Sequence, residues 1–168
     1  HNGQSNAGES YVVFGKTSGH PASFPLSSLN GTNGFILRGI DEFDNSGVSV
    51  NSAGDINGDG FSDIIIGAFA ADSNGQASGE TYVIFGKSSG FSSIIELSSL
   101  NGTNGFTING INGGEQLGYS ASSAGDINGD GLDDIIVGAR FAEPNNVEAA
   151  GETYIIFGKV SGYSSTLD

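Results

Sequence analysis

The sequence predicts an all-β fold made of four-stranded antiparallel β-propeller blades, and two observations lead to that prediction. The chain repeats itself at an interval of 71 residues: Gly54–Gly60 recurs as Gly125–Gly131, and Leu26–Phe35 recurs as Leu97–Phe106. Within each interval, short apolar runs alternate with segments rich in Gly and Asn, which favour turns over helix interiors. Four short strands per repeat, with small side chains in the first, are typical of a propeller blade.

The strands of one full repeat can be assigned in order. The first has small side chains, the second is a continuous β-branched run that indicates burial on both faces, and the fourth alternates apolar and polar residues. These strands are expected at Gly47–Ala53, Ile64–Ile66, Tyr82–Phe85 and Phe106–Asn109. A single helical turn is expected near Ser27–Leu29 and again near Ser98–Leu100.

The repeat count predicts that the chain does not close a ring by itself. Its 168 residues correspond to about 2.4 periods and nine strands, whereas closed propellers use about 4 to 8 blades. We expect residues 1–40 to hold the last two strands of a first blade, residues 41–111 a complete blade with a loop at 55–63, and residues 112–168 an incomplete blade with a loop at 126–134.

Composition and charge exclude several classes of protein. The chain has 19 acidic and 5 basic residues, a formal net charge of −14 and no cysteine. This argues against nucleic acid as a partner, because phosphate binding needs clustered Lys and Arg. The absence of cysteine excludes disulfide scaffolds, thiol catalysis and Cys-based metal sites. No apolar run approaches the roughly 20 residues of a membrane-spanning helix, so membrane insertion is not expected.

A loop of oxygen-bearing residues follows the first strand of each repeat. Asp55, Asn57 and Asp59 occupy alternate positions, Gly60 permits a sharp turn, and further oxygens come from the Phe61 carbonyl and Asp63. Alternating oxygen ligands suit a hard cation, and Ca²⁺ fits better than Mg²⁺, which prefers fewer protein ligands. Position 12 is Ile66 rather than the Glu of an EF-hand.

The same ligand pattern recurs 71 residues later. The second set consists of Asp126, Asn128, Asp130, the Leu132 carbonyl and Asp134, and Val137 stands at position 12. The alternative is an Asp-rich turn without a metal. Three carboxylates within nine residues would repel one another without a cation, and the pattern occurs twice in register. The sequence therefore predicts two Ca²⁺ sites.

The repeat resembles the FG-GAP repeat, the blade of integrin alpha-subunit propellers and of many bacterial surface proteins. The residues that carry the resemblance are Leu117–Ser120, Ala124–Gly131, Asp134–Ala139 and Gly151–Gly158, with Ser46–Ser49, Ala53–Gly60, Asp63–Ala68 and Gly79–Gly86 in the preceding repeat. The family's Phe of Phe-Gly is replaced by Ser46 or Leu117, and its Pro of Gly-Ala-Pro by Phe69 or Arg140. The resemblance implies Ca²⁺ bound between the first two strands of a blade by the two ligand sets named above, and roles in extracellular adhesion, binding and scaffolding.

Other candidate residues have simpler interpretations. His1 and His20 are expected on surface loops, and no positioned base for nucleophilic catalysis is evident. Glu9, Glu80 and Glu152 recur before the third strand, which indicates blade packing or hydrogen bonding rather than one active site. Asp133 is interpreted as a variable loop position because Ser62 replaces it in the other repeat.

A further pair of motifs has two interpretations. Asn30-Gly-Thr32 and Asn101-Gly-Thr103 match the N-glycosylation acceptor pattern. In a Gly-rich chain, Asn-Gly more often forms a turn, and this is the interpretation we favour.

The resulting hypothesis is a non-enzymatic, calcium-stabilised extracellular or cell-surface protein. Its first form is a structural protein that self-assembles through its open blade ends, because bare sheet edges are templates for association. The alternative is a ligand-binding adhesion module, a portion of a longer propeller with protein or glycan ligands, and a more distant one is an accessory domain of a secreted enzyme. The expected partners are therefore copies of the chain, or the rest of a longer propeller.

Overall fold

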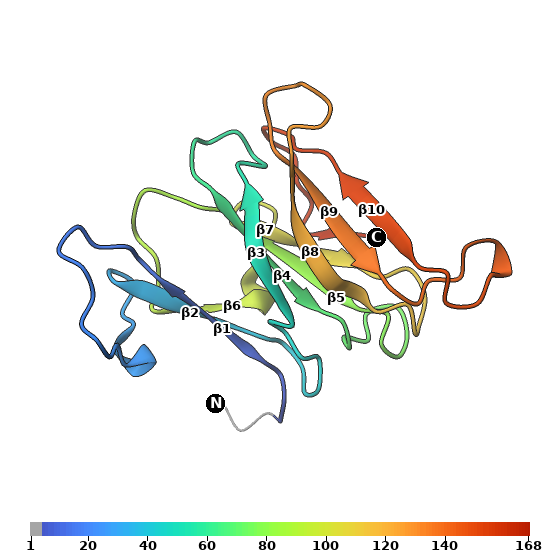
Figure 1. Cartoon of the computed structure of the whole chain (residues 1–168), viewed down its shortest axis with the longest axis horizontal. Coiled ribbons are helices and arrows are strands. Elements are labelled where there is room, and N and C mark those ends of the chain that lie inside the picture. The colour runs from blue at the N-terminus through green and yellow to red at the C-terminus, as the bar shows by residue number, and fades with distance from the viewer. Residues whose placement is uncertain (1–4) are drawn as a thin grey trace.

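The computed structural model describes residues 5–168, which form three sheets lying side by side (Figure 1). We call these sheets blade 1, blade 2 and blade 3. Blade 1 contains β1 (Glu9–Val13), β2 (Gly34–Arg38) and β6 (Ile94–Glu96); blade 2 contains β3 (Ser49–Gly54), β4 (Asp63–Ala68), β5 (Glu80–Ile84), β7 (Gly105–Asn109) and β11 (Thr166–Leu167); blade 3 contains β8 (Leu117–Gly125), β9 (Asp134–Ala139) and β10 (Glu152–Ile156). The short 3-10 turns are η1 (Leu26–Ser28), η2 (Leu97–Ser99) and η3 (Pro144–Asn146). No helix within the described residues is long and apolar enough to cross a membrane.

The predicted fold class is confirmed. Blade 2 has the expected order β3-β4-β5-β7 with antiparallel pairing throughout, and Ile65 lies opposite Val83 in the ladder between β4 and β5. The three sheets do not close into a ring (Figure 1). The two helical turns expected from the Leu-Ser-Ser segments are η1 and η2, which begin one residue earlier than predicted.

The expected count of nine strands is wrong, because the described residues form eleven. The two extra strands, β6 and β11, run parallel to the outermost strand of the preceding blade: Ile94 pairs with Ile36, and Thr166 pairs with Thr107. β6 follows β5 of blade 2 along the chain but joins the sheet of blade 1, and β11 follows β10 of blade 3 but joins the sheet of blade 2. The sequence gives little sign of such short strands, because their partners lie in another repeat.

The hydrophobic core lies between the blades rather than within one of them. Side chains of a strand point alternately to its two faces. Ile65 and Val83 therefore enter the core between blades 2 and 3, while Ile66, Tyr82 and Ile84 enter the core between blades 1 and 2. Both faces of blade 2 are covered, which explains the continuous apolar run at residues 64–66.

Small residues let the inner strands of neighbouring blades approach closely. A Cβ atom added at Gly67 on β4 would lie 1.8 Å from the carbonyl oxygen of Gly118 on β8. The Ser49 hydroxyl donates a hydrogen bond to that same carbonyl at 3.0 Å. The small side chains predicted for the first strand thus serve the joint between blades 2 and 3.

Candidate metal-binding loops

Both predicted loops join the first two strands of a blade. Residues 55–62 connect β3 to β4, and residues 126–133 connect β8 to β9. The two loops lie at the same upper edge of the molecule in Figure 1. The ligand residues predicted from the sequence are therefore placed at one end of adjacent blades, as the repeat requires.

The first three side chains of loop 55–63 are drawn into one turn. Asp55 accepts hydrogen bonds from the backbone N–H groups of Asp59 at 3.0 Å and Gly60 at 2.9 Å. The Asp59 N–H also donates to Asn57 Oδ1 at 2.9 Å, and Asn57 Nδ2 donates to Asp59 Oδ2 at 3.1 Å. The Phe61 N–H closes the turn by donating to Asp59 Oδ1 at 2.9 Å. Oxygen atoms of three alternate residues thus gather in one turn.

Loop 126–134 repeats this arrangement. Asp126 accepts hydrogen bonds from the N–H groups of Asp130 at 3.1 Å and Gly131 at 2.9 Å, and Asn128 Nδ2 donates to Asp130 Oδ2 at 2.9 Å. The Leu132 N–H donates to Asp130 Oδ1 at 2.9 Å. The two loops therefore have the same internal turn.

The last carboxylate of each loop is a buried anchor. Asp63 is 1% exposed, and its two oxygens accept hydrogen bonds from the N–H groups of Ile56 at 3.0 Å and Gly86 at 2.7 Å. Asp134, fully buried, accepts from Ile127 at 3.1 Å and Gly158 at 2.9 Å. Each carboxylate ties the start of its loop to the end of the third strand of the same blade.

The donor chemistry of the loops fits a hard cation. All the predicted ligands are oxygens, and a carboxylate that accepts one or two N–H groups still has lone pairs to offer. Side-chain ion pairs within residues 5–168 join Arg38 to Glu9 and Glu96, so none neutralises a loop carboxylate. Burial raises the pKa of Asp63 to about 6, and the nearby carboxylates of Asp59 and Asp55 act in the same direction.

The structure does not gather all the acidic ligands at one point. Within residues 5–168, no three Asp, Glu or His side chains form a group that could hold a metal ion. The turns of the two loops bring together Asp55, Asn57 and Asp59, or their counterparts in blade 3, while Asp63 and Asp134 serve the anchor described above. The Ca²⁺ assignment therefore stays a prediction.

Two residues at the joint between blades 2 and 3 were missed by sequence reasoning. Asp133, interpreted as a variable loop position, accepts a hydrogen bond from the Asp55 N–H at 2.8 Å. Tyr163 donates its hydroxyl to the Ile56 carbonyl at 2.9 Å. A single sequence carries no signal for either contact, because the repeat places Ser62 and Phe91 at the equivalent positions.

The recurring glutamates have a hydrogen-bonding role, as predicted. The hydroxyl of the tyrosine two residues later donates to each of them: Tyr11 to Glu9 at 2.6 Å, Tyr154 to Glu152 at 2.5 Å, and Tyr82 to Glu80. Burial is the main cause of the raised pKa of Glu80 and of Tyr82. These pairs lie in the third strand of each blade.

The remaining candidates also have a place in the structure. Asn30 and Asn101 each accept hydrogen bonds from the N–H and hydroxyl of the threonine two residues later, so both Asn-Gly-Thr motifs form the same turn. His20 is exposed and its ring lies 5.6 Å from that of Phe24. His1 lies outside the described residues.

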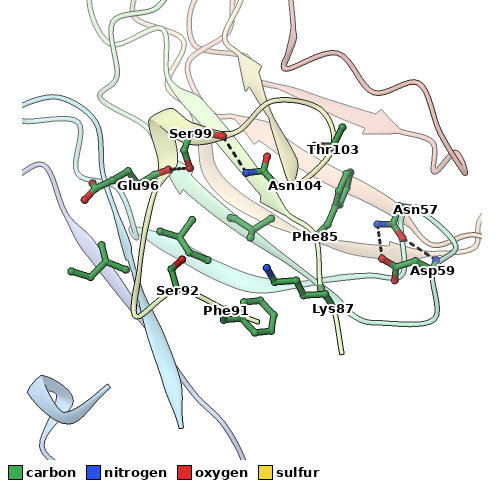
Figure 2. A pocket seen from close by; sticks show the side chains of 14 residues that line it. Asn57, Asp59, Phe85, Lys87, Phe91, Ser92, Glu96, Ser99, Thr103 and Asn104 are labelled. Atoms are coloured by element: carbon green, nitrogen blue, oxygen red, sulfur yellow. Dashed lines mark hydrogen bonds between the residues drawn. The ribbon is translucent and has the colours of Figure 1, made fainter. Parts of the chain in front are cut away.

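A pocket of about 610 Å³ lies beside the first loop (Figure 2). Figure 2 shows Asn57 and Asp59 at one end, Glu96 and Ser99 at the other, and Lys87 and Phe91 between them. The Lys87 Nζ atom lies 4.9 Å from the centre of the Phe91 ring. The lining contains no histidine.

Comparison with known proteins agrees with this geometry. The FG-GAP repeat model matches residues 47–84 and 117–156, which are the first three strands of blades 2 and 3 with their loops. Integrin alpha pat-2 of Caenorhabditis elegans is 37% identical over 105 residues, which cover 60% of this chain and 8% of that protein. Its Caenorhabditis briggsae counterpart is 34% identical over 105 residues, with the same coverage.

A third relative is Integrin alpha-PS2 of Drosophila melanogaster, 43% identical over 60 residues, or 33% of this chain and 4% of that protein. The match thus spans less than a tenth of the length of these relatives. The 71-residue repeat, the two loops and the blade topology agree with the family match. Residues 47–84 and 117–156 are FG-GAP repeats, and the chain is similar in sequence to part of the integrin alpha chains named above.

Proposed function

We propose that the chain is a calcium-stabilised, extracellular array of propeller blades with a structural rather than a catalytic role. Its open ends join further blades, supplied by a longer propeller or by other copies. The observation that carries this proposal is the contrast between β5, which pairs on both sides, and β1 and β10, which each present one free edge within residues 5–168. An unpaired strand edge is a template for association.

Calcium would stabilise each blade locally. A cation bound by Asp55, Asn57 and Asp59, and by their counterparts in blade 3, would neutralise carboxylates that no Lys or Arg in residues 5–168 pairs with. It would also fix the connection between the first two strands of the blade. An affinity of roughly 10⁻⁴–10⁻³ M would suit an extracellular module.

The strand counts at the two ends bear on how blades could join. Blade 3 presents the first three strands of a repeat, β8, β9 and β10, while blade 1 begins with the third, β1, followed by the fourth, β2. If two copies met rigidly head to tail, β8, β9 and β10 of one copy would form a shared blade with β1 and β2 of the other. That blade would contain five strands, two of them third strands, whereas blade 2 has four strands before β11 is added. Assembly of copies through such a shared blade would therefore require one strand to be displaced, whereas continuation into further repeats would not.

The mass of the chain in solution tests this proposal. We expect light scattering after gel filtration in Ca²⁺ to give a concentration-dependent mass above 17.0 kDa if copies assemble, and electron microscopy then to distinguish closed rings from filaments. A monomer at all concentrations would exclude self-assembly and leave continuation into further blades. A ring or fibre insensitive to chelation would contradict the calcium-stabilised form of the proposal.

The adhesion module is the second candidate, and the similarity to Integrin alpha pat-2 and Integrin alpha-PS2 favours it. In this form, loops at one edge of the blades contact an extracellular protein or glycan. Binding of the chain to immobilised matrix proteins or glycans, lost in chelator, would support it. Polymers that bind none of these ligands would support the structural role instead.

A further inference from the structure

The two metal-binding loops have matching ligands but different surroundings. Ile56, the second residue of the first loop, is fully buried, whereas Ile127 at the same position of the second loop is 54% exposed. The difference arises because blade 3 covers the start of loop 55–63. No further blade among residues 5–168 covers loop 126–134 in this way.

Asp133 makes two of the contacts across this joint. Its Oδ2 atom accepts a hydrogen bond from the Asp55 N–H at 2.8 Å, and its own N–H donates to the Asp55 carbonyl at 3.2 Å. Asp133 therefore forms hydrogen bonds with both the N–H and the carbonyl of Asp55, the first ligand residue. A carboxylate accepting from a backbone N–H makes a stronger hydrogen bond than a neutral acceptor does.

The carbonyl of Ile56 is held by two further donors from blade 3. The Lys159 N–H donates to it at 3.0 Å and the Tyr163 hydroxyl at 2.9 Å. The Tyr163 ring is itself fixed, because it stacks on Phe106 of blade 2 with centroids 4.6 Å apart and planes 10° apart. The hydroxyl is thus aimed at the loop by a rigid aromatic pair.

All four backbone groups at the start of the first loop are consequently fixed. Asp133 binds both groups of Asp55, blade 3 binds the Ile56 carbonyl, and Asp63 accepts from the Ile56 N–H. In the second loop, Asp134 accepts from the Ile127 N–H. No cross-blade bond from residues 5–168 reaches Asp126 or the Ile127 carbonyl.

We propose that Asp133 and Tyr163 are positioning residues, through which blade 3 pre-organises loop 55–63 for Ca²⁺. This inference rests on the proposed calcium binding. A site already held in its bound conformation loses less conformational entropy on binding, so the first loop binds Ca²⁺ more tightly than the second. Because such coupling is reciprocal, Ca²⁺ in the first loop also strengthens the docking of blade 3 on blade 2.

The repeat itself supplies matched substitutions. Ser62 stands at the position equivalent to Asp133, and Phe91 at the position equivalent to Tyr163. Phe91 stacks on Phe35 with the same centroid distance of 4.6 Å and interplanar angle of 10°. Tyr163→Phe is therefore expected to preserve the stack and remove only the hydrogen bonds of the hydroxyl.

The experiment uses two versions of the full chain, each with one loop silenced. Asp126→Ala/Asp130→Ala leaves the first loop active, and Asp55→Ala/Asp59→Ala leaves the second. Ca²⁺ is titrated into each by calorimetry after chelator treatment. Asp133→Ser and Tyr163→Phe are then added separately to both versions, with Glu148→Gln, which removes one charge from an exposed loop of the same blade, as the control.

We expect the first loop to bind Ca²⁺ at least about fivefold more tightly than the second, the low end of coupling between linked sites. Asp133→Ser and Tyr163→Phe should each weaken the first loop and leave the second unchanged, while Glu148→Gln changes neither. If Asp133→Ser prevents folding, Tyr163→Phe decides the question alone.

Two results would overturn the inference in distinguishable ways. Equal affinities at the two loops, with no response of the first loop to Tyr163→Phe, would refute the positioning role and leave calcium binding intact. A lack of binding at both loops would refute the proposed function, and the positioning role with it. Hydrogen exchange provides the reciprocal readout: Ca²⁺ should slow exchange of the Lys159 amide only when the first loop is active.

Discussion

The third strands of blades 2 and 3 have almost the same sequence and different surroundings. β5 reads Glu-Thr-Tyr-Val-Ile and β10 reads Glu-Thr-Tyr-Ile-Ile. Val83 in β5 is fully buried, while Ile155 at the same position of β10 is 41% exposed. Val83 faces the core between blades 2 and 3, whereas no blade within residues 5–168 packs on the equivalent face of β10. Burial of a blade strand is therefore decided by its neighbours and not by its own residues.

The metal-binding loops extend this comparison. Contacts inside a blade are the same in both copies, since Asp63 and Asp134 each bind two backbone N–H groups. Contacts between blades differ, since blade 3 covers Ile56 and Ile127 is exposed. Comparison of blades 2 and 3 thus distinguishes the hydrogen bonds that form within one repeat from the burial that depends on the next repeat.

The largest expected effect comes from the buried anchors, where the two blades should behave alike. Asp63→Ala leaves the N–H groups of Ile56 and Gly86 without their acceptor. Each unsatisfied buried donor costs about 1–3 kcal/mol, so we expect the free energy of unfolding to fall by about 2–5 kcal/mol. Asp134→Ala should cost a similar amount. Urea denaturation in chelator measures both without a contribution from calcium.

Asp63→Asn is the control, because the amide oxygen still accepts one of the two hydrogen bonds, and an intermediate loss is expected. A large loss in Asp63→Ala together with a negligible one in Asp134→Ala would break the claim that the anchor belongs to the single blade.

The core positions of β5 and β10 should respond differently. Ile84 is 3% exposed, and Ile156 at the equivalent position is only partly buried against its core. Truncation of a buried isoleucine costs about 2–5 kcal/mol, so Ile84→Ala should lose about 3 kcal/mol and Ile156→Ala roughly 1 kcal/mol. Equal losses would mean that another strand covers β10 in solution. That outcome would be recognised by stability that depends on protein concentration.

Asp44 lies in the connection between β2 of blade 1 and β3 of blade 2, and it should make the stability of this joint depend on pH. Burial raises the pKa of Asp44 to about 6, from an ordinary value of 3.8. Between these values the folded chain binds more protons than the unfolded chain, so this group makes stability fall as pH rises from about 4 to about 6. In chelator, Asp44→Asn should reduce that fall and be more stable than the parent at pH 7. Identical pH profiles would contradict a buried charge at this joint.

The smallest effect is expected at the surface of blade 1. Arg38 pairs with Glu9 at 3.1 Å and with Glu96 of β6 at 3.4 Å, with partly exposed side chains. Exposed ion pairs contribute about 0–1 kcal/mol. Arg38→Gln should therefore lower the unfolding free energy by about 0.5 kcal/mol, and less at high salt. A decrease in the unfolding free energy of more than about 2 kcal/mol would show that the ion pairs of Arg38, rather than the backbone hydrogen bonds of β6, attach β6 to blade 1.

Much of the fold could be predicted because the repeat aligns equivalent residues. The apolar run Ile64–Ile66 and the turn-forming Asn-Gly segments indicated strands and junctions, and these are where expected. β6 and β11 could not be predicted, because a strand of two or three residues is stabilised by a partner in another repeat. The residues of β6 and β11 themselves do not indicate which strand they will pair with.

The candidate site was predictable only in part, for the same reason. The alternating oxygens of Asp55, Asn57 and Asp59 follow from spacing, and the structure does gather them in one turn. The contact of Asp133 with Asp55 spans 78 positions and is absent from the other repeat. The difference between the repeats indicates only a variable loop position, although Asp133 lies at the joint between two blades.

The most direct test of the account is a calorimetric titration of Ca²⁺ into the chelator-treated chain. We predict two bound ions per chain, one of them lost in Asp55→Ala/Asp59→Ala and the other in Asp126→Ala/Asp130→Ala, with a higher unfolding temperature in Ca²⁺ than in chelator. No binding up to millimolar Ca²⁺, with an unfolding temperature that chelator leaves unchanged, would contradict the central claim that these blades are stabilised by calcium.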